Sequence, residues 1–225
     1  MTLEEAIRAR HSVRKYIDKP LEANDVAAIR SAIERINSES GLHIQLVLDE
    51  PKAFNGMFIT TYGQFSGVSN YFVMAAPKGK AWEEKVGYYG EQLVLLAQTL
   101  GLNTCWVGLT YKKVPEAYSL KDREIIHGVI SLGYGENQGK QHPLKPLEDF
   151  YNAEGEVPGW FLAGVEAALL APTAVNQQKF KFILHPGNIV EARPLFSMVG
   201  YTIVDLGIVK YHFELGAGKE NFSWK

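Results

Sequence analysis

Apolar residues recur at intervals of three and four in several segments of the chain, as they do on the buried face of an amphipathic helix. This spacing predicts five helices, over residues 2–10, 25–36, 86–101, 159–170 and 203–216. Between them lie short apolar or alternating runs that are typical of buried and half-buried strands. These runs predict strands over residues 43–48, 71–76, 104–107, 125–132 and 180–184.

Local signals place several of the helix ends. Thr2 and Glu5 have the spacing of a capping box at the start of the first helix. Residues 37–41 break the second helix, and glycines at 101 and 216 end the third and the last. The last helix is predicted to be amphipathic, with Val204, Ile208, Tyr211 and Leu215 on its buried face.

Two segments carry no clear periodicity. Residues 54–69 are rich in Gly, Thr, Tyr and Gln, which indicates a loop or a short helix. Residues 136–159 are polar and contain several prolines, so they are predicted to form a linker that crosses the surface.

Composition narrows the class of protein. The 225 residues are 46% hydrophobic and 21% charged, which is ordinary for a globular protein with one domain or two small ones. A net charge of −2 without a basic block argues against nucleic-acid binding. The one cysteine, Cys105, excludes a disulfide framework and is predicted to be a buried core residue. Acidic residues precede any apolar run at the start, and no apolar stretch could cross a bilayer, so a cytoplasmic protein is expected.

Arg10, Ser12 and Arg14 occupy alternate positions directly after the first helix. In extended backbone their side chains would point the same way, and two guanidiniums with a hydroxyl would suit a phosphate group. The alternative is a solvated basic turn in which Arg10 complements the helix dipole. The five residues alone leave both interpretations open.

The last third of the chain reads like a shortened copy of the first. Helix 25–36 and strand 43–48 match helix 161–172 and strand 179–184 at an offset of 136 residues, whereas helix 88–101 matches helix 203–216 at an offset of 115. Independent amphipathic helices with similar patterns are the alternative to a duplication. We therefore expect a single domain over 1–225 with pseudo-halves 1–150 and 151–225.

Four stretches resemble the FMN-dependent nitroreductase family. Arg10-His11-Ser12-Val13-Arg14 resembles its opening motif, and Ala171-Pro172-Thr173-Ala174-Val175-Asn176-Gln177-Gln178 resembles its Ala-Pro-Ser-x-x-Asn-x-Gln motif. Residues 100–108 are similar to its helix-to-strand segment beside the flavin ring. Residues 132–136, with 145–148 after them, are similar to its closing strand and basic tail.

The resemblance implies an α+β nitroreductase-like fold, with an antiparallel-dominated sheet flanked by helices. It also implies an FMN-dependent oxidoreductase that takes hydride from NADH or NADPH and passes electrons to a nitroaromatic, a quinone or another small acceptor. Hydride transfer is the chemistry of the cofactor, so no catalytic side-chain acid or base and no metal are nominated.

The resemblance also assigns cofactor-binding residues. Arg10, Ser12, Arg14 and Lys145 would hold the phosphate and ribityl chain, and His11 would pack or position backbone within the motif. The backbone of Val107, Gly108 and Leu109 would face the flavin N5 edge. From the other half, Pro172, Thr173, Ala174 and Asn176 would pack against the ring or ribityl chain, with a helix C-terminal turn as the alternative role of Asn176.

The order of the motifs departs from the family. Ordinary members pair the two motifs across a homodimer interface, whereas this chain carries one of each on complementary halves. We therefore expect a single-chain pseudo-dimer with one intact and one decayed FMN site, and a monomer in solution. In the loop before the second strand, Thr61, Tyr62 and Gln64 give no match to the family amide that reaches the pyrimidine side of the flavin.

Two other functions remain open. The chain could be an FMN-binding or small-ligand module without turnover if bulky residues such as Tyr62, Phe65 or Tyr201 cover the N5 face. A protein that has lost its cofactor is the third possibility. Two arginines are costly to gather without an anion, which disfavours it.

Overall fold

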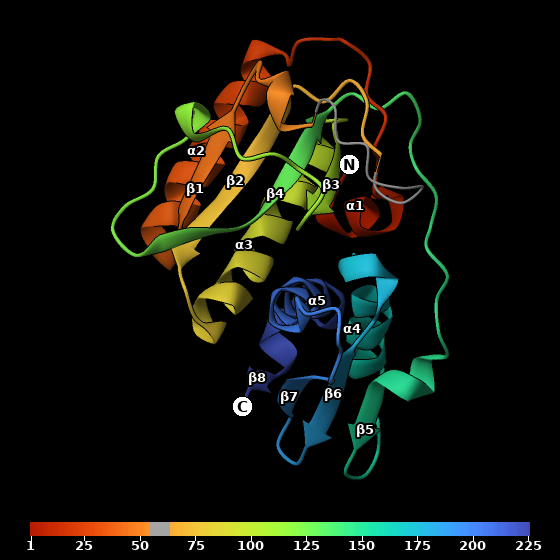
Figure 1. The fold of residues 1–225 in the computed structure, drawn as a ribbon. Helices are drawn as coiled ribbons and strands as arrows, with labels where there is room; N and C mark the ends of the chain where they lie inside the picture. Colours follow the sequence, from red (N-terminus) through yellow and green to blue (C-terminus); the bar gives the residue numbers. More distant parts are fainter. Residues whose placement is uncertain (55–63) are drawn as a thin grey trace.

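A computed structural model describes residues 1–54 and 64–225, and in it two four-stranded sheets lie on either side of a group of helices (Figure 1). The first sheet has the order β1-β2-β4-β3 with every neighbouring pair antiparallel. Its strands are β1 (His43–Val47), β2 (Asn70–Pro77), β3 (Asn103–Val107) and β4 (Glu124–Gly133). The predicted α+β fold with an antiparallel sheet is confirmed.

The second sheet has the order β5-β6-β7-β8 and is mixed. Its strands are β5 (Tyr151–Ala153), β6 (Phe180–His185), β7 (Ile189–Pro194) and β8 (Ser223–Trp224). Only the β6–β7 pair is antiparallel among the pairs of this sheet in the described residues. The sequence pattern predicts only β6, because β5 and β8 are too short to show a period and β7 carries Glu, Arg and Pro.

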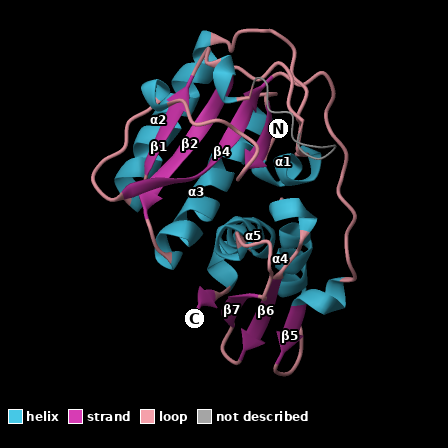
Figure 2. Ribbon diagram, viewed as in Figure 1, coloured by secondary structure: helices cyan, strands magenta, loops and turns pink. Residues whose placement is uncertain are grey.

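The helices lie largely between the sheets (Figure 2). They are α1 (Leu3–Ala9), α2 (Ala23–Ser40), α3 (Lys80–Thr99), α4 (Gly159–Leu169) and α5 (Thr202–Ala217). The capping box of α1 is present, with the Glu5 amide donating to the Thr2 hydroxyl at 3.2 Å. Helix α2 continues to Ser40, four residues beyond the predicted end, and stops where Gly41 adopts a left-handed conformation.

The segment 136–159 is more ordered than a linker. It contains a 3₁₀ turn, Leu147–Phe150, and then β5, which pairs with β6. Phe150 is buried, and its ring centroid lies 4.9 Å from that of Phe180. Apolar burial therefore anchors this segment to the second sheet.

Helix α5 is buried on more than one face, so the prediction of an amphipathic helix is wrong. It packs between α3 and α4 and also contacts the second sheet. Its buried polar side chains have partners: His212 lies 2.9 Å from Glu91, and Glu214 accepts hydrogen bonds from Tyr88 at 2.6 Å and Trp224 at 2.7 Å. The helix runs through Gly216 and ends at Ala217, before Gly218.

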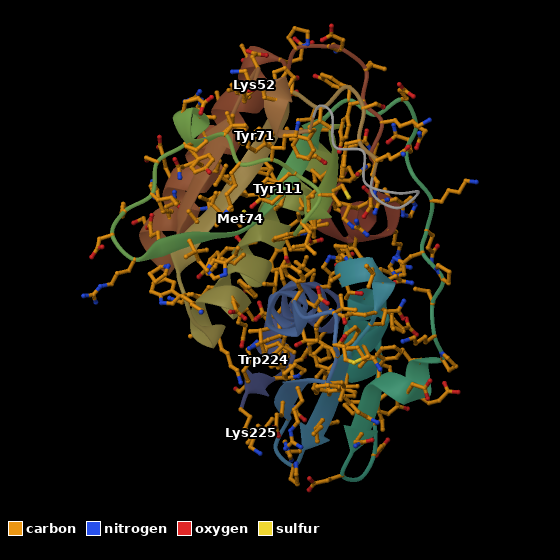
Figure 3. All side chains as sticks on the ribbon, in the orientation of Figure 1. Lys52, Tyr71, Met74, Tyr111, Trp224 and Lys225 are labelled. Carbon is orange, nitrogen blue, oxygen red and sulfur yellow. The ribbon has the colours of Figure 1, made fainter. Side chains whose placement is uncertain are left out.

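Glycines let α3 and α5 cross in backbone contact. A β-carbon on Gly87 would overlap the carbonyl oxygen of Val204, and one on Gly207 would overlap that of Glu84. One continuous core joins the two sheets through this crossing. Side chains fill the space between Met74 of β2 and Trp224 of β8 (Figure 3). No helix in residues 1–54 or 64–225 combines the length and apolarity that a membrane span requires.

Candidate functional site

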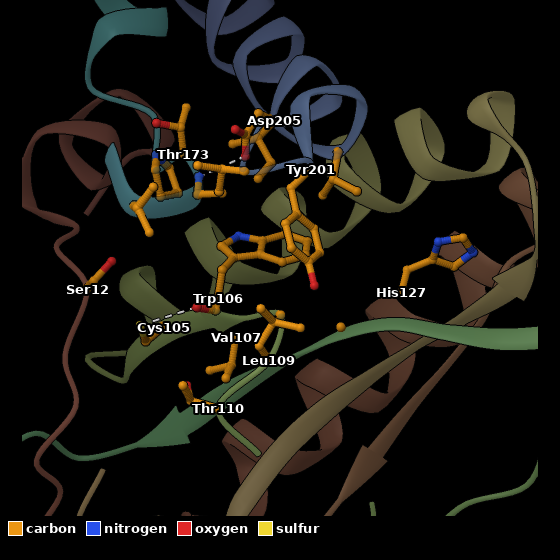
Figure 4. A pocket seen from close by; sticks show the side chains of 18 of the residues that line it. Ser12, Cys105, Trp106, Val107, Leu109, Thr110, His127, Thr173, Tyr201 and Asp205 are labelled. Carbon is orange, nitrogen blue, oxygen red and sulfur yellow. Dashed lines mark hydrogen bonds between the residues drawn. The ribbon is translucent and has the colours of Figure 1, made fainter. Parts of the chain in front are cut away.

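A cavity of about 240 Å³ lies where the start of the chain, the end of β3, the end of α4 and the start of α5 meet. Figure 4 shows Trp106 and Tyr201 near its centre, with Thr173 and Asp205 above them. Its lining comprises Ser12, Arg14, Phe65, residues 105–110, His127, Gly128, residues 172–175, Val199, Tyr201, Val204, Asp205 and Ile208. Residues more than 150 positions apart in sequence therefore share one pocket.

Residues 10–16, which we call the N-terminal wall, run along one side of the pocket, and Ser12 and Arg14 among them line it. They run beside β3, where the amide of Val13 donates to the carbonyl of Thr104 at 3.0 Å. The amide of Tyr16 donates to Ser66 at 2.9 Å, and the amide of Ser66 donates back to Arg14 at 3.0 Å. Alternation along this extended stretch directs Ser12 and Arg14 to the pocket and buries Val13 in the core.

Arg10 lies elsewhere, in the interior of the protein. Its side chain is 4% exposed, its Nη2 donates to the Leu170 carbonyl at 3.3 Å, and its Nε lies 3.9 Å from Glu91 Oε1. Burial lowers the pKa of Arg10, and the carboxylate of Glu91 opposes that shift. Arg10 thus faces a buried acid, whereas Arg14 lines the pocket.

Glu91 is also bound by two other side chains. The indole N–H of Trp106, a pocket residue, donates to Glu91 Oε2 at 2.8 Å. His212 Nδ1 lies 3.1 Å from the carbonyl of Ala167, which only accepts, so Nδ1 carries a proton. His212 Nε2 lies 2.9 Å from Glu91 Oε1. This buried network supports the pocket from behind.

Residues 172–178, which we call the C-terminal wall, form the opposite side. Val175, Asn176 and Gln178 all have positive φ, at 47°, 54° and 47°, although none is glycine. Such conformations are costly and persist only where the surroundings hold them. The Gln178 amide donates to the Thr173 hydroxyl at 3.0 Å, and the Gln178 side chain donates to the Pro143 carbonyl at 2.8 Å.

Asp205 holds this wall from α5. Its Oδ1 accepts from the Ala174 amide at 3.0 Å, and its Oδ2 accepts from the Gln177 side chain at 2.6 Å. Burial raises the pKa of Asp205 from 3.8 to about 7, and the two hydrogen bonds act in the opposite direction. The sequence pattern does not single out Asp205, because an acid in the first turn of a helix is common for electrostatic reasons alone.

Tyr201 covers the glycine at the end of β3. A β-carbon on Gly108 would lie 2.6 Å from both Cζ and the hydroxyl oxygen of Tyr201. Tyr201 itself has a φ of 60° where it caps α5. The absence of a side chain at Gly108 therefore allows an aromatic ring to approach the backbone.

Eight of the twelve predicted cofactor-binding residues line the pocket: Ser12, Arg14, Val107, Gly108, Leu109, Pro172, Thr173 and Ala174. The other four, Arg10, His11, Lys145 and Asn176, are outside the lining. Lys145 donates to the Gln177 carbonyl at 3.0 Å, and Asn176 donates to that of Pro143 at 3.2 Å. Contact of any of the twelve with a cofactor stays a prediction.

Two further predictions concern aromatic and thiol groups. Phe65 and Tyr201 line the pocket, while Tyr62 and Thr61 lie outside the described residues. Cys105 is buried, as predicted, and is also one of the residues that line the pocket; burial raises the pKa of its thiol. Among the described residues, no three His, Cys, Asp or Glu side chains are grouped as metal ligands.

The architecture around this pocket is that of nitroreductases. This chain is similar to the solved structure of a "putative nitroreductase" from Thermotoga maritima, with a TM-score of 0.63 and 22% identity. The superposition covers 98% of this chain and 85% of the other. The structure of a "Putative NADH dehydrogenase/NAD(P)H nitroreductase" from Parabacteroides distasonis covers 67% of this chain and 96% of its own, with a TM-score of 0.52 and 20% identity.

Sequence comparison is consistent with this class and places the chain within it. A curated Archaeoglobus fulgidus protein, "Putative NADH dehydrogenase/NAD(P)H nitroreductase", is 24% identical over 163 residues, which cover 66% of this chain and 88% of that protein. Residues 2–217 match the model of the family described as "Putative TM nitroreductase". The chain belongs to this nitroreductase family.

Proposed function

We propose that this protein is an FMN-dependent oxidoreductase that takes hydride from NADH or NADPH and reduces a nitroaromatic, a quinone or another small acceptor. One observation carries the proposal. Ser12 and Arg14 of the first nitroreductase motif line the same pocket as Pro172, Thr173 and Ala174 of the second. Membership of the nitroreductase family supports it.

The side chains of the pocket fit the chemistry of FMN. Val107, Leu109, Pro172, Ala174 and Ile208 give it apolar surfaces suited to a flat aromatic ring. Arg14 supplies a permanent cation and Ser12 a hydroxyl, which together suit a phosphate-bearing chain. Bound FMN would supply the hydride chemistry, and the chain would bind it, orient it and exclude water.

We also propose that the chain is a pseudo-dimer of 1–150 and 151–225, and strand register supports this. At the offset of 136 residues, Ile44 corresponds to Phe180. Ile44 pairs with Met74 and Phe180 pairs with Pro194, so Met74 corresponds to Pro194 at an offset of 120. The 16 residues missing from the second copy then fall in the hairpin turn between β6 and β7.

The crossing of α3 and α5 supports the same offset independently. Gly87 meets Val204 and Ile208, whereas Gly207 meets Glu84 and Tyr88. Each of these residues on α5 lies 120 positions after its counterpart on α3, so the two sets of contacts are reciprocal, as in a two-fold interface. We therefore propose an offset of 120 for these helices in place of the value of 115 that the helix pattern predicts. A chain that contains its own interface should be a monomer in sedimentation experiments.

A module that binds a ligand without turnover is the second candidate. The observation that favours it is the ring of Tyr201 over Gly108, where the resemblance expects the flavin N5 edge. A nicotinamide would need access to that edge. The two candidates therefore differ in whether a bound flavin can be reduced.

A visible spectrum tests both candidates. The protein is mixed with FMN, freed of excess cofactor and titrated anaerobically with NADH and then NADPH. A retained flavin spectrum that bleaches supports the oxidoreductase, and a retained spectrum that never bleaches supports the binding module. If Arg14→Ala and wild type both retain no flavin, the proposed function is wrong.

A further inference from the structure

Asp205 is the one carboxylate among the residues known to line the pocket, and its two side-chain hydrogen bonds within the described residues come from the C-terminal wall. It is 3% exposed, and each of its oxygens accepts a hydrogen bond from that wall, one from Ala174 and one from Gln177. The side chain of Gln177 also donates to the carbonyl of Gly200, just before α5, at 3.0 Å. Asp205 therefore holds the C-terminal wall at Ala174 and Gln177, and the Gly200 carbonyl holds Gln177 as well.

The loop needs such support because of its backbone. Val175 and Asn176, between the two residues that Asp205 holds, are left-handed and follow one another. Val175 is β-branched, which makes a positive φ particularly unfavourable. Its side chain is 52% exposed, so core packing contributes little to holding this conformation.

We propose that Asp205 is a positioning residue for the cofactor: its carboxylate clamps residues 174–177 and so presents Pro172, Thr173 and Ala174 to the pocket. Both of its partners are N–H donors, so the clamp is strongest with an ionised carboxylate. If either oxygen of Asp205 carried a proton, that O–H group would face an N–H group, and one of the two hydrogen bonds would be lost. Acid should therefore loosen the wall.

Charged and titratable groups from several other elements share the pocket with Asp205. The other titratable groups that line the pocket are Arg14 of the N-terminal wall, Cys105 of β3, His127 of β4 and Tyr201 of the α5 cap. Burial and the two hydrogen bonds account for the altered pKa of Asp205, which lies at about 7. The Asp205 carboxylate should thus pass from mostly ionised at pH 8 to mostly protonated at pH 6, and the clamp should weaken over this range.

Amide exchange in the FMN-free protein tests the clamp without any cofactor. We expect the protection of the Ala174 amide, normalised for intrinsic exchange, to fall about tenfold in Asp205→Asn. In wild type it should fall as the pH goes from 8 to 6. The Tyr16 amide, which donates to Ser66, should keep its protection throughout and serves as the internal reference. Unchanged protection of Ala174 in Asp205→Asn would overturn the proposal.

The affinity for FMN tests whether the clamp positions the cofactor, and this second experiment rests on the proposed function. The dissociation constant, measured by flavin fluorescence at several pH values, should rise about tenfold in Asp205→Asn, and the variant should lack the part of the pH dependence that follows the Asp205 carboxylate. Asp149→Asn removes an exposed acid of a 3₁₀ turn and should behave like wild type. A purely structural role would leave the pH profile of the variant parallel to that of wild type, and that result would count against positioning.

A third variant guards against failure to fold. Gln177→Met removes one of the two donors from a half-buried side chain and keeps the carboxylate. It should weaken FMN binding severalfold and leave the Ala174 bond to Asp205 in place. If wild type binds no FMN, the proposed function fails, and the exchange of the Ala174 amide alone decides the fate of the clamp.

Discussion

The two walls of the pocket are held in different ways. The N-terminal wall is tied by backbone hydrogen bonds to Thr104, Ser66 and Glu136. The C-terminal wall is tied largely by side chains, with Asp205, Gln177 and Thr173 among them. The N-terminal wall thus extends the first sheet beside β3, while the C-terminal wall is a strained loop that neighbouring side chains hold in place.

This difference predicts different sensitivities. Backbone hydrogen bonds do not titrate and survive most substitutions, so the N-terminal wall should respond mainly to changes that displace the backbone or leave a charge unpaired. The C-terminal wall should respond to the loss of single polar groups and to pH. Variants on each side can test this contrast.

Arg10→Ala should give the largest effect, because Arg10 is the side-chain anchor at the start of the N-terminal wall. Removal of its charge leaves Glu91 with His212 and Trp106 alone and empties a buried site. We expect a loss of about 3 kcal/mol in the free energy of unfolding, measured with urea.

The exposed Arg8→Ala serves as the control for Arg10→Ala and should change the stability by less than about 0.5 kcal/mol. If Arg10 instead binds the FMN phosphate, as the motif implies, Arg10→Ala would leave the FMN-free protein stable and weaken FMN binding. The two measurements together separate an internal anchor from a ligand.

Gly67→Ala should give the next largest effect. Gly67 has a φ of 70°, and a β-carbon there would overlap the carbonyl oxygen of Tyr16 in the N-terminal wall. Backbone strain and displacement together should cost about 2–3 kcal/mol in unfolding experiments. Gly155→Ala, also at positive φ but with open space around it, isolates the cost of strain. Equal losses of stability in the two variants would show that the backbone of Tyr16 moves aside at little cost, which would contradict this prediction.

Local signals made much of the fold predictable. The capping box of Thr2 and Glu5 lies within one turn, and the periods of α3 and α4 depend on one buried face each. The second sheet could not be predicted in the same way. Residues 151–153 become a strand because β6 lies beside them, about 30 residues further along the chain. A partner so distant leaves no local pattern.

The site shows the same division. Motifs identified the segments around Ser12 and Pro172, and alternation placed Ser12 and Arg14 correctly on one face. Arg10 does not join them, because it caps α1 and the extended pairing begins only at Ser12. Asp205 escaped prediction since its partners lie 31 and 28 residues away in sequence.

The pH dependence of stability sharpens the contrast between the walls. The pKa of Asp205 is about 7 in the folded protein and 3.8 without burial, so the native state binds this proton more tightly than the unfolded chain does. The resulting stabilisation is complete below about pH 4 and is lost as the pH rises through 7.

From pH 8 to pH 5.5, the free energy of unfolding of wild type should therefore rise by about 2 kcal/mol relative to Asp205→Asn, as measured with urea. Global stability would increase while protection of the Ala174 amide decreases, because burial favours the neutral acid and the clamp favours the anion. A difference between wild type and variant that stays constant with pH would contradict this linkage.

Lys145→Ala should give the smallest effect. The ammonium group is exposed and donates to the Gln177 carbonyl, so it contacts the C-terminal wall at the surface. Such a bond contributes less than about 0.5 kcal/mol, and we expect unfolding and FMN affinity to change little, with a dissociation constant within about threefold of wild type. A much larger loss of FMN affinity without a loss of stability would instead support the role that the basic tail of the family implies, in which Lys145 binds the phosphate. In that case the Lys145 side chain would have to leave the Gln177 carbonyl, so its contact with the C-terminal wall would be lost when FMN binds.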